Sequence, residues 1–162
     1  LENMDSNNMN ETTQYLFFKL DDEVYAINSY NVLEVVDFKP IQKVPHTNKC
    51  ITGVTNIRGE LVAVVDPKIR FGNKSCEVSK RTSFIIINIF NKITKEEVPV
   101  ALVVDYILEV DDVLNSDILD APEFGTKIEK RFIKNIIKYK DNYVSILKIS
   151  LVLEINELSK RG

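Results

Sequence analysis

Short apolar runs separated by polar turns fill the chain from residue 14 onward, and this pattern is typical of a mainly β protein. Aspartate and asparagine stand at two of the turns, Asp21-Asp22 and Asp141-Asn142, where their side chains favour chain reversal. The runs of strand length cover residues 15–20, 24–27, 61–65, 82–90, 98–104, 107–113, 133–139 and 143–149. We therefore predict a fold built from β-hairpins.

Residues 28–37 carry a different signal. Val32, Val35 and Val36 recur at helical spacing. Ser29 stands ahead of them and is a residue type that caps helix starts. We predict a short helix here that runs into a strand.

Other helical turns are expected at three places. One lies within 49–55, and one covers 68–71 and ends at Gly72, because glycine commonly follows the last helical residue. The third is a C-terminal helix over 151–160 with Ser150 as its cap. Its apolar stripe consists of Leu151, Ile155 and Leu158.

The elements suggest two halves of similar build. Segment 60–66 resembles 98–105, since each is an apolar strand that ends at an aspartate. Any strand of that kind would give the same likeness, so the repeat alone does not establish a duplication. Two small barrels are the simplest architecture, with a polar surface loop over 115–130. Residues 1–12 are polar and predict a disordered tail, within which Met4 is the expected natural start.

Composition fits a globular protein of the cell interior. The chain is 44% hydrophobic and 28% charged, and its net charge of -3 argues against nucleic acid as the main partner. No apolar run reaches the roughly 18–20 residues of a membrane span, and no secretory signal opens the chain. Cys50 and Cys76 lack metal-binding spacing, so a reduced cytoplasmic setting fits best, with a disulfide between them as the lesser alternative.

The chain offers little for catalysis or metal binding. His46 is its only histidine, and the local sequence supplies no third group to orient a dyad with Cys50. The five glycines never approach a phosphate-binding spacing. Carboxylates at 111–112 and 117–123 lack the order of a calcium loop and indicate a solvated acidic stretch. We predict no catalytic residue, no metal and no cofactor.

Arg58 stands between two apolar runs and directly before Gly59, where a tight hairpin turn is expected. An arginine at such a tip is usually solvated. Arginine is also a preferred anchor at protein interfaces, because its planar side chain forms several directed hydrogen bonds. The local sequence does not decide between these two roles.

The whole run Ile51-Thr-Gly-Val-Thr-Asn-Ile-Arg-Gly-Glu-Leu-Val-Ala-Val-Val-Asp66, followed by Pro67-Lys-Ile-Arg-Phe-Gly72, resembles the characteristic segment of CheW-like domains. Further similar segments follow the family order and extend the resemblance over about residues 14–159. They are Phe17 to Ile27, Asn31 to Val35, Val44-Pro45, Leu102 to Asp105 and Ala121 to Phe124.

The resemblance implies a protein without catalysis, with two SH3-like five-stranded β-barrels and a groove between them. The first subdomain would cover roughly 22–80, and the second roughly 13–21 plus 81–150. CheW couples transmembrane chemoreceptors to the histidine kinase CheA in bacterial chemotaxis. The implied partners are the cytoplasmic tip of methyl-accepting receptors and the regulatory domain of CheA. The implied location is the cytoplasm, at the inner face of the membrane through receptor arrays, without insertion into the membrane and without nucleic acid.

Matching positions carry the implied site residues. Receptor contacts fall on Val32, Glu34, Val35 and Arg58, and kinase contacts on Gly53, Asn56 and Gly59. The sequence departs from the family pattern at Ala63, where proline is usual, and at Pro67, where leucine is usual. Within 115–134 it also follows the family only loosely after Phe124.

Two alternatives stay open. The chain could be a CheW-like module of a larger protein, either the adaptor domain of CheV or the regulatory domain of CheA. The alternative from another class is a small enzyme that uses Cys50 and His46.

Overall fold

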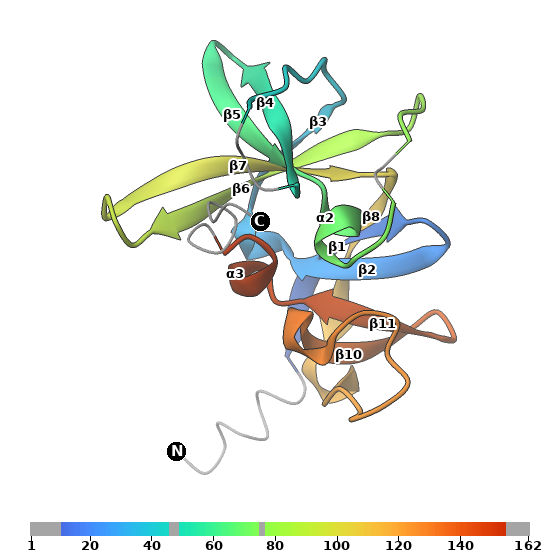
Figure 1. The fold of residues 1–162 in the computed structure, drawn as a ribbon. Coiled ribbons are helices and arrows are strands. Elements are labelled where there is room, and N and C mark those ends of the chain that lie inside the picture. Colours follow the sequence, from blue (N-terminus) through green and yellow to red (C-terminus); the bar gives the residue numbers. More distant parts are fainter. Residues whose placement is uncertain (1–10, 46–48, 75–76, 155–162) are drawn as a thin grey trace.

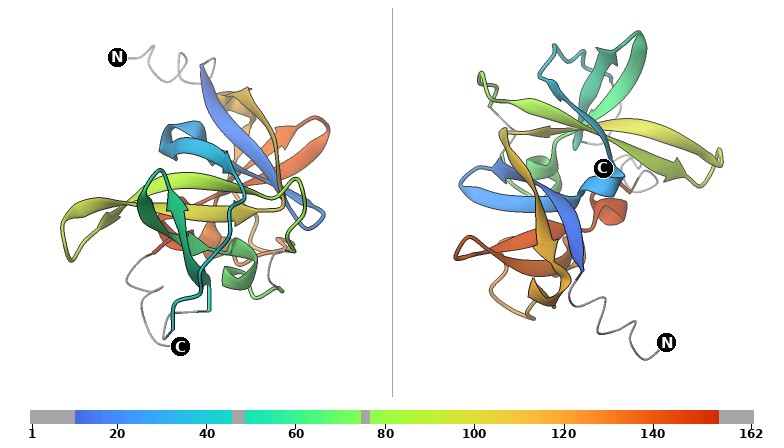
Figure 2. Two further views of the ribbon diagram at one scale, coloured as in Figure 1. Left: turned by 90° about the horizontal axis from the view of Figure 1, so that it is seen from above. Right: turned by 180° about the vertical axis from the view of Figure 1, so that it is seen from behind.

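The structure is a computed structural model that describes residues 11–45, 49–74 and 77–154. Its strands form a six-stranded sheet and a five-stranded sheet. The two sheets lie one above the other (Figure 1), and the view from behind agrees (Figure 2). The short helices lie at the ends of strands, where they join or cover the sheets.

The six-stranded sheet has the order β8-β1-β2-β11-β10-β9. Its strands are β1 (Thr12–Leu20), β2 (Glu23–Asn28), β8 (Tyr106–Leu114), β9 (Ile118–Leu119), β10 (Ile133–Tyr139) and β11 (Asn142–Leu147). Neighbours pair antiparallel except β2 and β11, which form a short parallel pair. Strands distant in sequence therefore meet at the centre of this sheet.

The five-stranded sheet has the order β3-β6-β7-β5-β4. Its strands are β3 (Val32–Asp37), β4 (Ile51–Ile57), β5 (Glu60–Val65), β6 (Ser83–Asn91) and β7 (Glu96–Val104). Its one parallel pair joins β5 to β7. β3 and β4 form the two edges, and Gln42 in the connection between them exchanges two backbone hydrogen bonds of 2.8 Å with Val54 of β4.

The helices are η1 (Ser29–Asn31), α2 (Pro67–Arg70), η2 (Asn115–Asp117), η3 (Lys130–Phe132) and α3 (Ile149–Val152). α2 begins where β5 ends, because the buried side chain of Asp66 accepts a 2.9 Å hydrogen bond from the backbone N–H of Lys68. Pro67 occupies the first helical position, which suits proline since no helical hydrogen bond is needed there.

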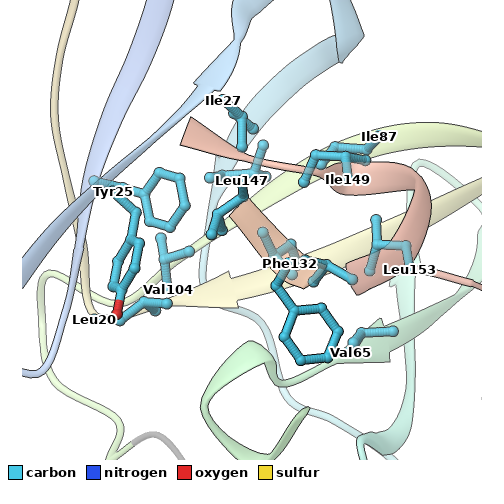
Figure 3. Close-up of a cluster of buried hydrophobic side chains, with 14 of the residues drawn as sticks. Leu20, Tyr25, Ile27, Val65, Ile87, Val104, Phe132, Leu147, Ile149 and Leu153 are labelled. Carbon is cyan, nitrogen blue, oxygen red and sulfur yellow. The ribbon is translucent and has the colours of Figure 1, made fainter. Parts of the chain in front are cut away.

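Buried side chains form three clusters, one between the sheets and one against the other face of each sheet. The shared cluster takes Leu16, Phe18, Ile85, Ile87, Leu102 and Val104 from the central strands, together with Phe132, Leu147, Ile149 and Leu153. Figure 3 shows ten residues of this cluster by name, from both sheets and from α3. The alternate residues of the same strands enter the other two clusters, for example Phe17 on β1 and Phe84 on β6. The central parts of these strands, such as residues 15–18 of β1 and 84–87 of β6, are therefore apolar at consecutive positions.

The prediction of a mainly β fold with two small β subdomains and short helices is confirmed, and so are all the predicted strands. The first subdomain has the five strands expected of an SH3-like unit. The second has six rather than five, because the two residues of β9 pair with β10.

The sheets divide the chain differently from the expected subdomain limits. β2, expected in the first subdomain, pairs with β1, because a hairpin turn keeps the two strands in one sheet. β6 and β7, expected in the second subdomain, pair with β3 and β5. The limits 22–80 and 13–21 plus 81–150 therefore need correction: β1, β2 and β8 to β11 form one sheet, and β3 to β7 the other.

Over residues 28–37 the prediction of a short helix that runs into a strand is confirmed, but the helix is the single turn η1 with Asn28 rather than Ser29 as its cap, and Val32, Val35 and Val36 lie in β3. One helical prediction in the first half was wrong. Residues 51–57 form β4, although a helical turn was expected within 49–55. The turn at 67–70 is confirmed, with Gly72 just beyond its end at φ 87°.

The ends of the chain also differ from expectation. β1 begins at Thr12, within the predicted tail, and residues 1–10 lie outside the described part. α3 begins at Ile149 instead of after Ser150, and Lys148 is its cap. Of the predicted helix over 151–160, the structure shows helix only to Val152, with Leu153 as the C-cap, and residues 155–160 lie outside the described residues.

The shared cluster should dominate the stability of both sheets. Leu102 is fully buried within it, whereas Leu61 of β5 is 72% exposed. We expect Leu102→Ala to lower the free energy of unfolding by about 2–5 kcal/mol in urea denaturation, because it removes buried methyl groups and leaves a cavity. The matched control Leu61→Ala should change it by less than about 0.5 kcal/mol. Equal losses in the two variants would contradict the shared core.

Candidate functional site

The turn between β4 and β5 presents Arg58 at its tip. Arg58 and Gly59 are its two central residues, with φ of 54° and 87°. Such positive values produce the tight hairpin turn whose twist matches the flanking strands. The side-chain Oδ1 of Asn56 accepts a 2.8 Å hydrogen bond from the backbone N–H of Gly59. The local sequence Asn-Ile-Arg-Gly thus shapes the turn and holds the arginine outward.

Arg58 forms an ion pair with Glu34 of β3. The guanidinium Nη2 lies 2.7 Å from Oε2 of Glu34, and the two side chains are 79% and 24% exposed. The pair joins the hairpin tip to the opposite edge strand of the same sheet. Because both groups contact water, the pair should contribute at most about 1 kcal/mol to stability. Its charges therefore remain available to a partner.

The side chains of β3 alternate between partly buried and exposed. Val32 packs against the shared cluster and is therefore mainly a structural residue. Val35 and its neighbour Leu33 are exposed by 42% and 56%. An edge strand that carries two exposed aliphatic side chains beside a charged pair is suited to contact another protein.

Gly53 lies within β4, where the neighbouring chain comes too close for any side chain. A Cβ atom there would lie 2.2 Å from the backbone oxygen of Gln42 and 2.7 Å from Cγ2 of Ile41. The φ of 153° is also one that other residues rarely adopt. Gly53 thus permits the connection from β3 to lie directly on β4.

The structure brings most of the seven predicted site residues together at one end of the five-stranded sheet. Glu34 and Arg58 are in direct contact, and Asn56 and Gly59 belong to the same turn. Gly53 lies farther along β4 and contributes backbone shape rather than a contact group.

Sequence reasoning missed two exposed residues of this region. Leu33 lies next to Glu34 in β3. Leu61 lies opposite Asn56 in the hairpin, and its side chain is more exposed than those of Leu33 and Val35. The signal was present in the alternation of β3 and β5, since once the buried face is known, the intervening aliphatic residues must point outward. In β3 this alternation was overlooked because Val32, Val35 and Val36 also recur at helical spacing.

The best-defined clefts of the described residues measure about 280 to 610 Å³, and none of them is lined by a predicted site residue. One of about 610 Å³ lies between the sheets and is lined by residues such as Tyr15, Phe90 and Ile149. The candidate site is therefore an open surface of strand edge and hairpin tip.

Groups with displaced pKa values lie in the other sheet. Hydrogen bonds from Lys140 and Tyr139 hold the pKa of Glu109 below its usual range. Burial, reinforced by Glu23, raises the pKa of Tyr25 to about 12. These shifts accompany packing and surface ion pairs and do not create an acid–base pair at the candidate site.

The residues considered for other chemistry do not assemble into a site that the structure describes. Cys50 is buried, while His46 and Cys76 lie outside the described residues. Among residues 11–45, 49–74 and 77–154 no group of three or more potential metal ligands occurs. Within the same ranges, no helix is long and apolar enough to cross a membrane.

A solvent-accessible ion pair with exposed aliphatic residues nearby, at the edges of the five-stranded sheet, is suited to binding another protein. The sequence profile of the CheW-like domain matches residues 14–158. The chain therefore belongs to the CheW-like domain family, whose members are scaffold and adaptor proteins rather than enzymes. The prediction of a chemotaxis scaffold without catalysis is confirmed at this level.

Individual relatives agree with this assignment. The chain is 24% identical to the chemotaxis protein CheW of Klebsiella aerogenes over 146 residues, and this aligned region covers 90% of this chain and 84% of the relative. It is 29% identical to that of Helicobacter pylori, with 89% and 83% covered. The crystal structure of the scaffolding protein TtCheW from Thermoanaerobacter tengcongensis superposes with a TM-score of 0.79 at 30% identity, over 93% of this chain and 92% of that one.

Gly53 and Gly59 should differ in their response to substitution. Gly53→Ala places a methyl group against the backbone of Gln42, so we expect it to lower the free energy of unfolding by at least about 3 kcal/mol. Gly59→Ala meets no atom within 4 Å and should cost about 1 kcal/mol, from its positive φ alone. Chemical denaturation measures both, and equal losses would contradict the close approach at Gly53.

Proposed function

We propose that this protein is a cytoplasmic adaptor that couples methyl-accepting chemoreceptors to the histidine kinase CheA, and that receptors recruit it to the inner face of the membrane. Membership in a family of chemotaxis scaffolds supports the general role. The observation that carries the specific proposal is the solvent-accessible Glu34–Arg58 pair on the five-stranded sheet, with the exposed aliphatic residues Leu33 and Val35 on the same edge strand.

The receptor would contact β3 and the hairpin tip. A receptor helix presents apolar residues along one face, and Val35 with its neighbour Leu33 offers exposed aliphatic surface to such a face. Glu34 and Arg58 would fix the orientation of the helix through charge-assisted hydrogen bonds. Val32 would support this surface from the core side, since it packs against the shared cluster.

The regulatory domain of CheA would contact the β4–β5 hairpin. Asn56 and Gly59 set the shape of its turn, and Leu61 supplies an exposed apolar side chain next to it. Gly53 would act indirectly, by holding β4 against the preceding connection. Exposed apolar area with charged groups at its rim is typical of interfaces that form and separate readily.

Removal of the arginine should weaken coupling while the fold stays intact. Arg58→Ala leaves the positive φ to another non-glycine residue, so we expect little change in the free energy of unfolding. We expect receptor affinity or receptor-dependent CheA activity to fall roughly five- to thirtyfold, the effect of losing an interface anchor.

The matched control is Lys95→Ala. Lys95 is also an exposed basic residue with positive φ, at 59°, in the β6–β7 turn of the same sheet. It should keep wild-type coupling. Wild-type coupling by Arg58→Ala would remove Arg58 from the interface, and a wild-type protein that binds neither a receptor fragment nor CheA would refute the adaptor proposal.

Exchanging the two charges separates the contribution of the Glu34–Arg58 pair to the stability of the protein from its contribution to binding a partner. The double variant Glu34→Arg/Arg58→Glu can rebuild the ion pair in reverse, so its stability should match the wild type. We expect coupling to stay impaired, because each partner group then faces the wrong charge. Full recovery of coupling would mean that the two residues serve only to hold the hairpin to β3.

A further inference from the structure

The α2 segment belongs to the five-stranded sheet but binds the other sheet through consecutive side chains. It follows β5 directly and comprises four residues. Lys68 and Arg70 both extend from it toward elements of the six-stranded sheet. Phe71, just after the helix, packs its ring 6.1 Å from that of Tyr25 and 5.2 Å from that of Phe132.

Lys68 is a buried cation held by two carboxylates. Its side chain is 6% exposed, and Nζ lies 2.9 Å from Oδ1 of Asp21 and 3.3 Å from both carboxylate oxygens of Asp105. Asp21 lies in the β1–β2 turn, and Asp105 joins β7 to β8. Oδ2 of Asp105 also accepts a 2.5 Å hydrogen bond from the backbone N–H of Asp21. One network thus ties α2 to the turn and to the crossing point between the sheets.

Arg70 makes a second connection on the other side of α2. Its Nη2 donates a 2.9 Å hydrogen bond to the backbone oxygen of Leu151, and Nε donates one of 3.3 Å to that of Val152. These carbonyls belong to α3, whose side chains enter the shared cluster. The guanidinium also lies 5.0 Å from the ring centre of Phe132.

Directed contacts add something that the shared cluster does not supply. Hydrophobic burial holds the two sheets together but has no preferred direction, so it permits small rotations of one sheet over the other. Charge-assisted hydrogen bonds require defined distances and angles. A buried lysine between two carboxylates therefore selects one relative orientation and penalises the others, because any displacement leaves a charge unpaired away from water.

We infer that Lys68 and Arg70 are positioning residues that set the angle between the two sheets, and through it the placement of the candidate surface on the five-stranded sheet relative to the six-stranded sheet. The first part stands on the geometry of α2 alone. The second part rests on the proposed adaptor function, since a partner that contacts the candidate surface and also reaches the six-stranded sheet must find the two sheets at a defined angle.

Residual dipolar couplings of backbone N–H groups in the weakly aligned full chain test the first part. Couplings of β3 to β7 and of the six-stranded sheet are fitted separately. The wild type and the control Lys138→Met, an exposed lysine of β10, should give one alignment tensor for both sheets. Lys68→Met and Arg70→Gln should give a good fit within each sheet but lose the common tensor, and the conservative variant Lys68→Arg should restore it.

A common tensor with unchanged orientation in both Lys68→Met and Arg70→Gln would overturn the inference. If Lys68→Met does not fold, the triple variant Lys68→Met/Asp21→Asn/Asp105→Asn replaces it, because a neutral cluster of similar shape leaves no buried charge unpaired. The triple variant should also lose the common tensor, and its retention would count against the inference in the same way.

Receptor-dependent activation of CheA by the same variants tests the second part. Variants without a common tensor should lose coupling although Glu34 and Arg58 are unchanged, and Lys68→Arg should recover it. Full coupling by a variant with independent sheets would show that their angle does not serve the adaptor role. If the wild type itself fails to couple, the proposed function fails while the tensor result still decides the positioning role of α2.

Discussion

The layer of apolar side chains between the two sheets is the constraint on which the rest of the structure depends. β1, β6 and β7 lie at its centre and bury both faces, one in the shared layer and one in the cluster behind their own sheet. A strand buried on both faces must be apolar at successive positions. The two subdomains therefore cannot separate without exposing the larger part of both cores, and the chain crosses between them to build each sheet.

Polar groups divide into two kinds around this layer. Those of α2 are buried and join the sheets, so their loss should affect how the sheets are oriented. Those at the β4–β5 tip are exposed and join only one edge strand to a hairpin, so they contribute little to stability. Substitutions at the exposed tip, where a partner would bind, should therefore cost little free energy of folding. Substitutions of the buried groups of α2, which orient the sheets, should cost more.

Strand runs were predictable because their lengths and turn residues are local properties. The segment 84–87 and the hairpin around Arg58-Gly59 needed no tertiary information. The short helix before β3 was expected to reach farther than it does, because Val32, Val35 and Val36 show helical spacing although they lie in an edge strand with aliphatic residues on both faces. The prediction within 49–55 failed because β4 is held by pairing with β5 and with Gln42, which are contacts with other segments. Of the candidate site, the sequence indicated the residues but not that Glu34 and Arg58 contact each other.

By itself, the sequence determined the mainly β character, the positions of the hairpins and the family, and it indicated several residues of the candidate surface, because each depends on residue order over short distances or on a continuous pattern. Only the tertiary structure decided which hairpins share a sheet, that the β6–β7 hairpin joins β3 to β5, and that α2 links the two halves. These depend on which apolar faces find each other across the shared layer and on which charges become buried together. Arg58, exposed at a hairpin tip, could be recognised from its neighbours in sequence, whereas the role of Lys68 appears only when Asp21 and Asp105 come to it from elsewhere in the chain.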